Sequence, residues 1–316
     1  MKKMTIALIS GGVSSEREVS LKSGRQVFEA LDRAKYTVLQ YDPKTDLQKL
    51  MADAPTIDAA LIILHGPFGE DGTVQGMLDL LGIPYQGAGV LGSALAMNKL
   101  AAKRLYENAG LRVPPYVCVD RKGSLDVDAC IDRLGLPLVI KPVSGGSSIG
   151  MSIVKSRQAL EPAVEKAFLY DRSVMVESFI QGTEITVGVI GNDTLEALPP
   201  IEIVPGEGYE FFDYEAKYTA GATREICPAR IDRALTEKVQ HCARMAHEAL
   251  FLRGYSRTDF ILKDGEFHVL ETNTIPGMTP TSLLPQAAQA AGISFSLLLD
   301  RLITLSIEDH QHRKTA

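Results

Sequence analysis

The feature that most constrains the fold is an alternation of short apolar runs with amphipathic stretches in the first third of the 316-residue chain. The pattern predicts strands at residues 4–9, 37–41 and 59–64, and helices at 20–31, 72–81 and 90–108. Strands that alternate with helices indicate a parallel sheet covered on both faces. The sequence therefore predicts a doubly wound N-terminal α/β domain, whose last helix can end at Gly110.

In sheets of this kind, ligands bind where the strands end. Two loops follow predicted strands in this way, at residues 10–16 and 65–72. Taken alone, Glu16 fits a helix cap. His65 likewise fits a structural histidine satisfied by backbone groups. Residues of these two loops are therefore candidates for a site, but their types do not decide it.

Val113-Pro114-Pro115 predicts a linker, because consecutive prolines oppose both helix and interior strand. The pattern of apolar runs changes after it. Strands at 137–141 and 173–177, with a helix at 159–169, predict a small α+β middle domain.

The remainder of the chain predicts a third domain of mixed strands and helices. Its strands are expected at 184–191, 195–204, 257–262 and 267–270, and its helices at 232–252, 282–291 and 295–307. A loop at 205–222 is rich in glycine and aromatic residues, and we expect it to be a lid that orders over bound ligand. The predicted domains are 1–112, 113–183 and 184–316.

Charge and cysteine content exclude several classes of protein. The net charge of −6 offers no general attraction for nucleic acid or anionic lipid, so any phosphate must meet a local basic site. The four cysteines lack metal-ligand spacing and fit free, buried thiols in a reducing compartment. The apolar run at residues 4–9 is too short for a signal peptide or a membrane span. We therefore expect a cytoplasmic, soluble chain without nucleic-acid or membrane partners.

A glycine- and serine-rich loop after Lys141 is the most informative local feature. A lysine that leaves a strand can neutralise phosphate, and a Gly/Ser loop can present backbone N–H groups to phosphate oxygens. The loop contains no GxxxxGK[ST] sequence and so is not a P-loop. Such runs are also common in flexible surface loops, but the apolar residues 138–140 and Ile149 favour a loop packed on a sheet.

Hard oxygen ligands mark a second candidate site, at Asp259, Glu271 and Asn273. These groups suit Mg²⁺, which keeps some waters and bridges to substrate phosphates. For Asp259 and Glu271 to face one way, we expect a three-residue hairpin loop at 263–265 that pairs Leu262 with Glu266. This register puts Arg257 and the three candidate ligands on one face, with positive φ at Gly265.

The order of the motifs along the chain carries a family resemblance. The motifs are Glu16-Arg17-Glu18-Val19-Ser20-Leu21, His65-Gly-x-x-Gly-Glu-Asp-Gly-Thr-x-Gln75, Lys141-Pro-x-x-x-Gly-Ser-Ser-x-Gly150, Tyr214-Glu-Ala-Lys-Tyr218 and Glu271-x-Asn-x-x-Pro-Gly277. Together they resemble the D-alanine–D-alanine ligases of the ATP-grasp superfamily, in that family's order and across essentially the whole chain. The resemblance implies a three-domain ATP-grasp fold with ATP held between the middle and last domains.

The resemblance also implies a role for particular residues. ATP would contact Lys99, Lys141, Ser147, Ser148, Glu177 (adenine), Glu184 (ribose) and Lys217; two Mg²⁺ ions, with Mn²⁺ as a substitute, would bind Asp259, Glu271 and Asn273. The D-alanine molecules would contact Glu16, His65, Arg257, Gly277, Ser282 and Leu283, and Tyr218 would join Glu16 and Ser147 in a hydrogen-bonded set. Thr258 and Thr272 depart from the family's usual aliphatic residues, and we expect both to point away from the metals.

The activity that the resemblance implies is ATP-dependent joining of two D-alanine molecules, for peptidoglycan precursor synthesis. A homodimer is an assembly that the resemblance allows. Three other readings stay open. The first is a ligase with D-serine or D-lactate as acceptor. The second is a Rossmann-type dehydrogenase, which lacks GxGxxG and leaves the Asp/Glu/Asn cluster unexplained. The third is a non-catalytic nucleotide-binding regulator, although Lys141 and the metal ligands are all present.

Overall fold

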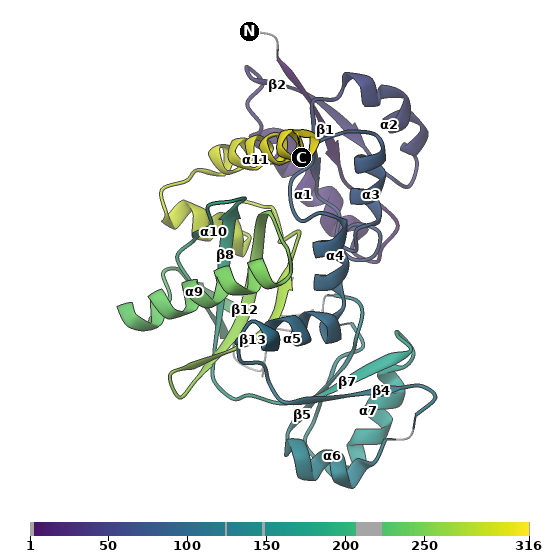
Figure 1. Cartoon of the computed structure of the whole chain (residues 1–316), viewed down its shortest axis with the longest axis vertical. Coiled ribbons are helices and arrows are strands. Elements are labelled where there is room, and N and C mark those ends of the chain that lie inside the picture. Colours follow the sequence, from purple (N-terminus) through teal and green to yellow (C-terminus); the bar gives the residue numbers. More distant parts are fainter. Residues whose placement is uncertain (1–2, 124, 147–148, 207–222, 316) are drawn as a thin grey trace.

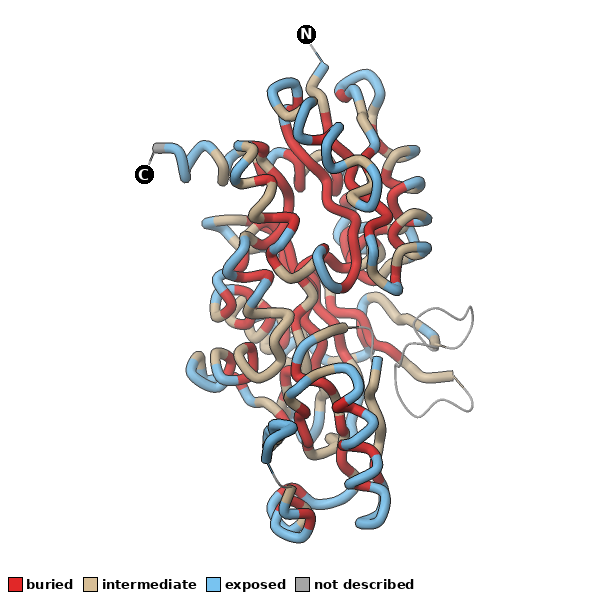
Figure 2. Tube along the Cα trace, turned by 90° about the vertical axis from the view of Figure 1, so that its right-hand side faces the viewer, coloured by how far each residue is buried: buried red, intermediate tan, exposed pale blue. Residues whose placement is uncertain are grey.

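Figure 1 shows the computed structural model of the chain, in which residues 3–123, 125–146, 149–206 and 223–315 are described. Three sheets follow one another along the long axis, and each is built largely from one third of the chain. Figure 2 shows buried segments running through each of these layers.

The N-terminal sheet is parallel, with strand order β2-β1-β3. Its strands are β1 (Met4–Ile9), β2 (Tyr36–Tyr41) and β3 (Ala59–Ile62). One face packs against α1 (Arg17–Ala30) and α11 (Phe295–Thr315) through Ile6, Leu8 and Leu61. The other face packs against α2 (Leu47–Asp53) and α3 (Thr73–Leu80) through Ala7, Ile9 and Ile62. Alternate residues of each strand are thus buried on opposite faces, which confirms the predicted parallel sheet covered on both faces.

The single helix predicted at 90–108 is wrong, because the structure has two helices, α4 (Val90–Met97) and α5 (Lys99–Asn108). Asn98 between them is extended, and its side chain accepts a hydrogen bond from the N–H of Ala101 at 3.0 Å. The Lys99 N–H donates to the Val143 carbonyl at 2.9 Å. The break therefore comes from a contact with the distant glycine/serine loop, which periodicity cannot reveal. Gly110 has φ +83° and follows the end of α5, as predicted.

The middle sheet is antiparallel, with strand order β4-β7-β5-β6. It comprises β4 (Tyr116–Asp120), β5 (Leu138–Pro142), β6 (Ser152–Val154) and β7 (Ser173–Ser178). Helices α6 (Val127–Leu134) and α7 (Leu160–Ala167), with the 3₁₀ turn η2 (Arg157–Ala159), cover one face. The α+β character was predicted, whereas β4, β6 and α6 were not.

The last sheet has six strands, in the order β11-β10-β8-β12-β13, with β9 paired to β8. They are β8 (Thr183–Gly191), β9 (Glu196–Ala197), β10 (Ile201–Pro205), β11 (Thr223–Ile226), β12 (Gly254–Lys263) and β13 (Glu266–Asn273). Helix α9 (Arg233–Ala249) packs on one face, and α10 (Leu283–Ala290) packs near β8 on the other. The single strand predicted at 195–204 is divided in two, because Pro199 and Pro200 interrupt it.

The predicted three-residue hairpin is also wrong. Lys263 pairs with Glu266, so the turn has two residues, Asp264 and Gly265, with φ +51° and +75°. Positive φ at both positions fits a type I′ turn and confirms the prediction for Gly265. A β-bulge compensates for the shorter turn: the register shifts between Asp259 and Phe260, and Leu270 is the extra residue.

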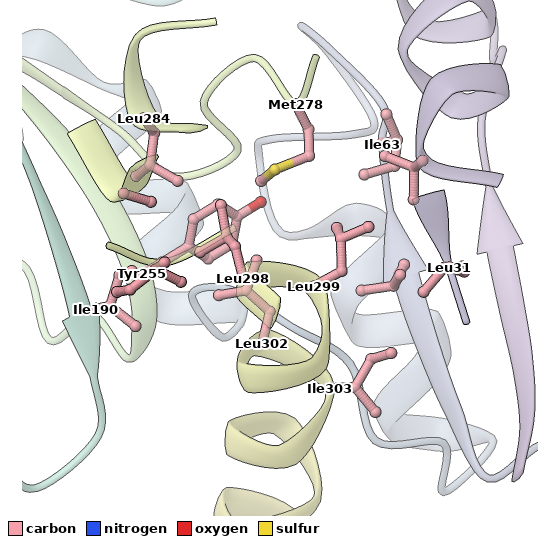
Figure 3. Close-up of a cluster of buried hydrophobic side chains, with 14 of the residues drawn as sticks. Leu31, Ile63, Ile190, Tyr255, Met278, Leu284, Leu298, Leu299, Leu302 and Ile303 are labelled. Carbon is pink, nitrogen blue, oxygen red and sulfur yellow. The ribbon is translucent and has the colours of Figure 1, made fainter. Parts of the chain in front are cut away.

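Helix α11 joins the N-terminal sheet to the last sheet. Its Leu298, Leu299 and Leu302 lie between Ile63 on one side and Tyr255 on the other (Figure 3). Ion pairs continue this contact, with Arg253 2.5 Å from Asp309 and Arg313 2.9 Å from Asp79. The helix extends well beyond its predicted end at residue 307, and its core contact fixes how the first and last sheets sit.

Two further expectations concern membranes and cysteines. Within the described part of the chain, no single helix is long and apolar enough to cross a membrane; the bent pair α10 and α11 meets that test together by length and composition only. All four cysteines are free thiols as expected, but only Cys130 among them is buried. Cys227 and Cys242 are half-buried, and Cys118 is exposed because it lies on the edge strand β4.

Candidate nucleotide and ligand site

A pocket opens between the middle and last sheets, with β5 and β7 on one side and β12 and β13 on the other. Six residues predicted for ATP or metal line it: Lys99, Lys141, Glu177, Glu184, Asp259 and Glu271. The remaining lining is mostly apolar and includes Val139, Ile153, Phe179, Ile261 and Leu270. An apolar slot lined at its ends by lysines and carboxylates suits an aromatic base joined to a charged phosphate chain.

The glycine loop forms the mouth of this pocket beside Lys99. The Lys99 Nζ donates to the Gly145 carbonyl at 2.5 Å, and the N–H of Ser144 donates to Asp171 at 2.7 Å. Gly145 has φ +107°, a conformation that glycine adopts without strain. The loop is thus tied at its start to the first residue of α5. Ser147 and Ser148 lie outside the described residues.

A buried ionic cluster lies at the floor of the pocket. Glu177 is 2% exposed, and its Oε2 lies 2.9 Å from Lys103 Nζ and 3.2 Å from Lys141 Nζ. Burial alone would raise the pKa of Glu177, but the two ammonium groups bring it below its usual value. Burial lowers the pKa of Lys103, and Glu177 opposes that effect. The sequence interpretation missed Lys103, although its spacing of four from Lys99 places both on one side of a helix.

The candidate metal ligands share one face of the β12–β13 hairpin, as predicted, although by a different register. Asp259 pairs with Glu271, and Arg257 pairs with Asn273. Without the bulge, the two-residue turn would pair Asp259 with Leu270 and turn Glu271 to the opposite face.

Several groups hold the Asp259 carboxylate. Arg257 donates to both carboxylate oxygens, at 3.0 and 2.8 Å, and the Asn273 amide donates at 3.2 Å. Thr186 on β8 donates to the same carboxylate at 2.5 Å. Burial lowers the pKa of Arg257, but Asp259 and Glu271 raise it above its usual value overall. The sequence interpretation missed Thr186, which lies two residues after Glu184 and so shares a strand face with it.

The donor set fits Mg²⁺ rather than a metal that needs many protein ligands. Within the described ranges, no group of three or more His, Cys, Asp or Glu side chains is placed to hold a metal. Two carboxylates and one amide instead match an ion that keeps waters and takes further oxygens from a phosphate. The lysines across the pocket stand where those phosphates would lie.

Behind this hairpin lies a chain of buried hydroxyls. The Tyr106 hydroxyl on α5 bonds to Thr272 at 2.7 Å, and Thr272 is 2.9 Å from Thr258. Tyr106 and Thr258 are fully buried and Thr272 nearly so. Thr258 and Thr272 thus lie on the face opposite to the metal ligands, as predicted, and they connect that face to α5.

The two loops of the N-terminal sheet meet at Glu16 and His65. The Ser14 hydroxyl donates to the His65 carbonyl at 2.7 Å, which ties one loop to the other. A Cβ added to Gly66 would lie 3.0 Å from the Glu16 carboxylate, so the backbone approaches that carboxylate closely. The Glu16 side chain makes no helix-capping bond, which removes the simple cap interpretation.

His65 is buried, and its Nε2 has no hydrogen-bond partner among the described residues. Burial lowers the pKa of His65, although Glu16 opposes this. His65 lines a separate, largely apolar pocket on the N-terminal domain, together with Gly12 and Ser14, rather than the pocket between the other two sheets.

Glu70 is a carboxylate of the loop that carries His65. It accepts a hydrogen bond from the Gly66 N–H at 2.6 Å. Burial raises its pKa to about 8, with Glu16 and Glu271 adding to the rise and Arg257 opposing it. Glu70 is thus held by the backbone of its own loop, and the charges of Glu16, Glu271 and Arg257 act on it. The sequence interpretation treated Glu70 only as one letter of a motif.

The segment after β13 brings Gly277 against Ser282. A Cβ on Gly277 would lie 3.0 Å from the Ser282 hydroxyl, which itself contacts Thr279 at 2.8 Å. Leu283 is buried at the start of α10. Lys217, Tyr218 and residues 207–222 of the predicted lid lie outside the described residues.

Comparisons with known proteins agree with this geometry. Residues 42–88 match the family "D-ala D-ala ligase N-terminus", and residues 105–304 match "D-ala D-ala ligase C-terminus". The D-alanine–D-alanine ligase of Syntrophobacter fumaroxidans is 63% identical over 98% of this chain and 99% of its own length. That of Desulfotalea psychrophila is 55% identical, over 99% of this chain and 98% of its own.

Solved structures of such ligases also superpose on nearly the whole chain. The Bacillus anthracis D-alanine–D-alanine ligase complexed with ATP has a TM-score of 0.87 at 37% identity, covering 98% of this chain and 99% of that one. The VanG D-Ala:D-Ser ligase of Enterococcus faecalis has a TM-score of 0.81 at 34% identity, covering 96% and 100%. The chain therefore has the ATP-grasp fold and belongs to the D-alanine–D-alanine ligase family of ATP-dependent ligases.

Proposed function

We propose that this chain joins two D-alanine molecules to D-alanyl-D-alanine with ATP, and so supplies a peptidoglycan precursor in the cytoplasm. The observation that carries the proposal is the pocket in which Lys99 and Lys141 face Asp259 and Glu271 across an apolar slot. Phosphoryl transfer needs this arrangement of fixed charges, because catalysis of that step is mainly positioning and charge stabilisation.

The chemistry follows from the poor leaving group of a carboxylate. A carboxylate oxygen of the first D-alanine attacks the γ-phosphorus of ATP, the bond to the β-phosphate oxygen breaks, and ADP leaves. The amine of the second D-alanine, having lost its proton, then attacks the acyl carbon. The peptide bond forms as inorganic phosphate departs. Negative charge develops in both steps, and Lys99, Lys141 and Arg257 are the described cations placed to stabilise it.

We assign Asp259, Glu271 and Asn273 to two Mg²⁺ ions, for which Mn²⁺ can substitute. Bound ions of this kind neutralise phosphate charge and orient the reacting oxygens. Glu271→Gln should therefore lower activity by on the order of a thousandfold. Asp193→Asn, a matched change at an exposed position in the turn after β8, should leave activity unchanged. Equal losses in the two variants would remove the metal assignment.

We assign the substrates to the residues that the family resemblance implies. Glu16 and His65 take the first D-alanine, with Glu16 opposite its ammonium group. Arg257 and Gly277 face the oxyanionic species, and Ser282 with Leu283 take the carboxylate end of the second D-alanine. Glu184 takes the ribose, while Ser147, Ser148, Lys217 and Tyr218 close over the nucleotide. A homodimer is the assembly proposed with this function.

An ADP-release assay tests the function. ADP formation should require D-alanine and Mg²⁺ together, and L-alanine should not replace D-alanine. Formation of ADP at equal rates with and without D-alanine would refute the ligase proposal. If ADP formed faster with D-serine or D-lactate as the second substrate, that compound and not D-alanine would be assigned as the acceptor.

A further inference from the structure

One of the carboxylates that line the nucleotide pocket, Glu177, lies on β7 of the middle sheet. Val139 lies directly beside it on β5, and Tyr116 lies beside it on β4. An ionised carboxylate only accepts hydrogen bonds. A flat base that enters the slot therefore meets an acceptor, and it fits if it presents an N–H group at its edge.

Lys103 reaches this carboxylate from behind the pocket. It is 1% exposed and is not part of the pocket lining, yet its Nζ lies 2.9 Å from Glu177 Oε2. The ammonium also lies 5.7 Å from the centre of the Tyr116 ring, a favourable cation–π position. Lys103 therefore touches neither solvent nor the space where a nucleotide would lie.

Lys141 differs from Lys103 because it lines the pocket as well as contacting Glu177. A bound phosphate would compete with Glu177 for the Lys141 ammonium. If Lys141 were the only cation, each gain at the phosphate would leave a buried carboxylate without a counter-charge, which is strongly unfavourable or forces protonation of the carboxylate. Lys103 removes this conflict, since it stays on Glu177 whichever partner Lys141 takes.

We propose that Lys103 is a positioning residue for base recognition: it keeps Glu177 as an ionised, fixed acceptor, so that the site takes a 6-amino purine and rejects a 6-oxo purine. The inference rests on the proposed function and extends it to the selection of the nucleotide. Lys103 acts only through Glu177 and makes no contact with ATP.

The test compares Lys103→Met with the wild type in binding ADP and IDP by calorimetry. The two nucleotides differ at the 6 position, which is an amino group in ADP and a carbonyl in IDP. The wild type should favour ADP by on the order of a hundredfold, because a carbonyl against a buried acceptor leaves both unpaired. In Lys103→Met the Glu177 carboxyl can take up a proton and donate to a carbonyl. The ADP preference should then fall at least about tenfold.

Steady-state rates separate base selection from catalysis. In Lys103→Met the KM for ATP should rise about tenfold or more while kcat at saturating ATP stays within about threefold of the wild type. Arg104→Met, at the next and exposed position of α5, is the matched control and should change neither the nucleotide preference nor the KM.

The double variant Lys103→Met/Glu177→Gln covers the case in which the single variant fails to fold. If Lys103 acts only through Glu177, the double variant should fold and show the same ADP-to-IDP ratio as Glu177→Gln. A folded Lys103→Met with the wild-type ratio, a double variant that differs from Glu177→Gln, or an unfolded double variant would each overturn the proposal. Nucleotide binding needs no D-alanine, so an absence of D-alanine-dependent ADP release would count against the ligase function alone.

Discussion

Helix α5 meets the two walls of the nucleotide pocket through different chemistry. On the middle-sheet side, Lys103 makes a buried ion pair with Glu177. On the last-sheet side, three residues further along, Tyr106 makes a neutral hydroxyl contact with Thr272. Both contacts are buried, but only the first has a member that also lines the pocket. The ionic contact thus belongs to ligand recognition, whereas the hydroxyl contact holds the helix against the hairpin.

The largest expected effect comes from breaking the ionic contact on one side only. Glu177→Gln leaves the Lys103 ammonium buried without a counter-charge, which should lower the free energy of unfolding by roughly 3 kcal/mol or more. Urea unfolding at neutral pH measures this. A loss below about 1 kcal/mol would mean that the two contacts of α5 are energetically alike.

A buried histidine on α9, which contacts β12, gives a third contact whose contribution to stability should depend on pH. His247 Nδ1 lies 2.8 Å from the Ser256 hydroxyl, and burial lowers the His247 pKa from 6.5 to about 4. The unfolded chain therefore binds a proton at higher pH than the folded chain, so stability falls as pH drops from 6.5 towards 4. The loss should total about 3 kcal/mol at 1.4 kcal/mol per pH unit.

The matched measurement for this loss is the difference in unfolding free energy between the wild type and His247→Gln at each pH. Groups other than His247 contribute equally to both proteins and cancel. A difference that stays constant from pH 7 to pH 4 would show that His247 is not held neutral.

A smaller effect is expected from the hydroxyl contact. Tyr106→Phe removes one hydroxyl and leaves Thr258 and Thr272 bonded to each other, so the unfolding free energy should fall by about 1 kcal/mol. The ADP-to-IDP preference should not change, because Tyr106 does not line the pocket. Thermal unfolding and nucleotide calorimetry on the same sample test both statements, and a lost preference would contradict the division of labour between the two contacts.

The smallest effect should come from removing all three hydroxyls together. Tyr106→Phe/Thr258→Val/Thr272→Val removes all three connected hydroxyls, so none of them loses its partner while it stays buried. The substituted side chains keep nearly their original shapes. We expect a net change within about 1 kcal/mol of the wild type. A larger loss than in Tyr106→Phe alone would show that the hydroxyl chain contributes more than its separate bonds.

Residues that line the pocket and the residue behind it differ in how far they can be predicted from sequence. Lys141 follows an apolar strand and precedes a glycine loop, and Asp259 and Glu271 lie on apolar strands, so local pattern alone marks all three. Lys103 looks like any helix-surface lysine, because its burial depends on Tyr116 and Glu177 in another part of the chain. Local pattern contains no signal for such a contact beyond its spacing from Lys99.

Register and helix breaks show the same limit. The shared face of Asp259 and Glu271 was predicted, but the route to it was wrong, because a bulge at Leu270 compensates for a two-residue turn. A three-residue turn without a bulge and a two-residue turn with one extra strand residue put the same side chains on one face. The pattern of faces therefore cannot distinguish the two arrangements. The break at Asn98 likewise depends on a contact with Val143 and Ser144 that lies outside helical periodicity.

We infer that a carboxylate oxygen of D-alanine attacks ATP in this pocket to form an acyl phosphate. The direct test uses D-alanine labelled with oxygen-18 in its carboxylate, with mass spectrometry of the inorganic phosphate released during turnover. One labelled oxygen should appear in each phosphate, because the acyl carbon–oxygen bond breaks when the amine attacks. Release of unlabelled phosphate alongside D-alanyl-D-alanine would contradict the acyl phosphate route.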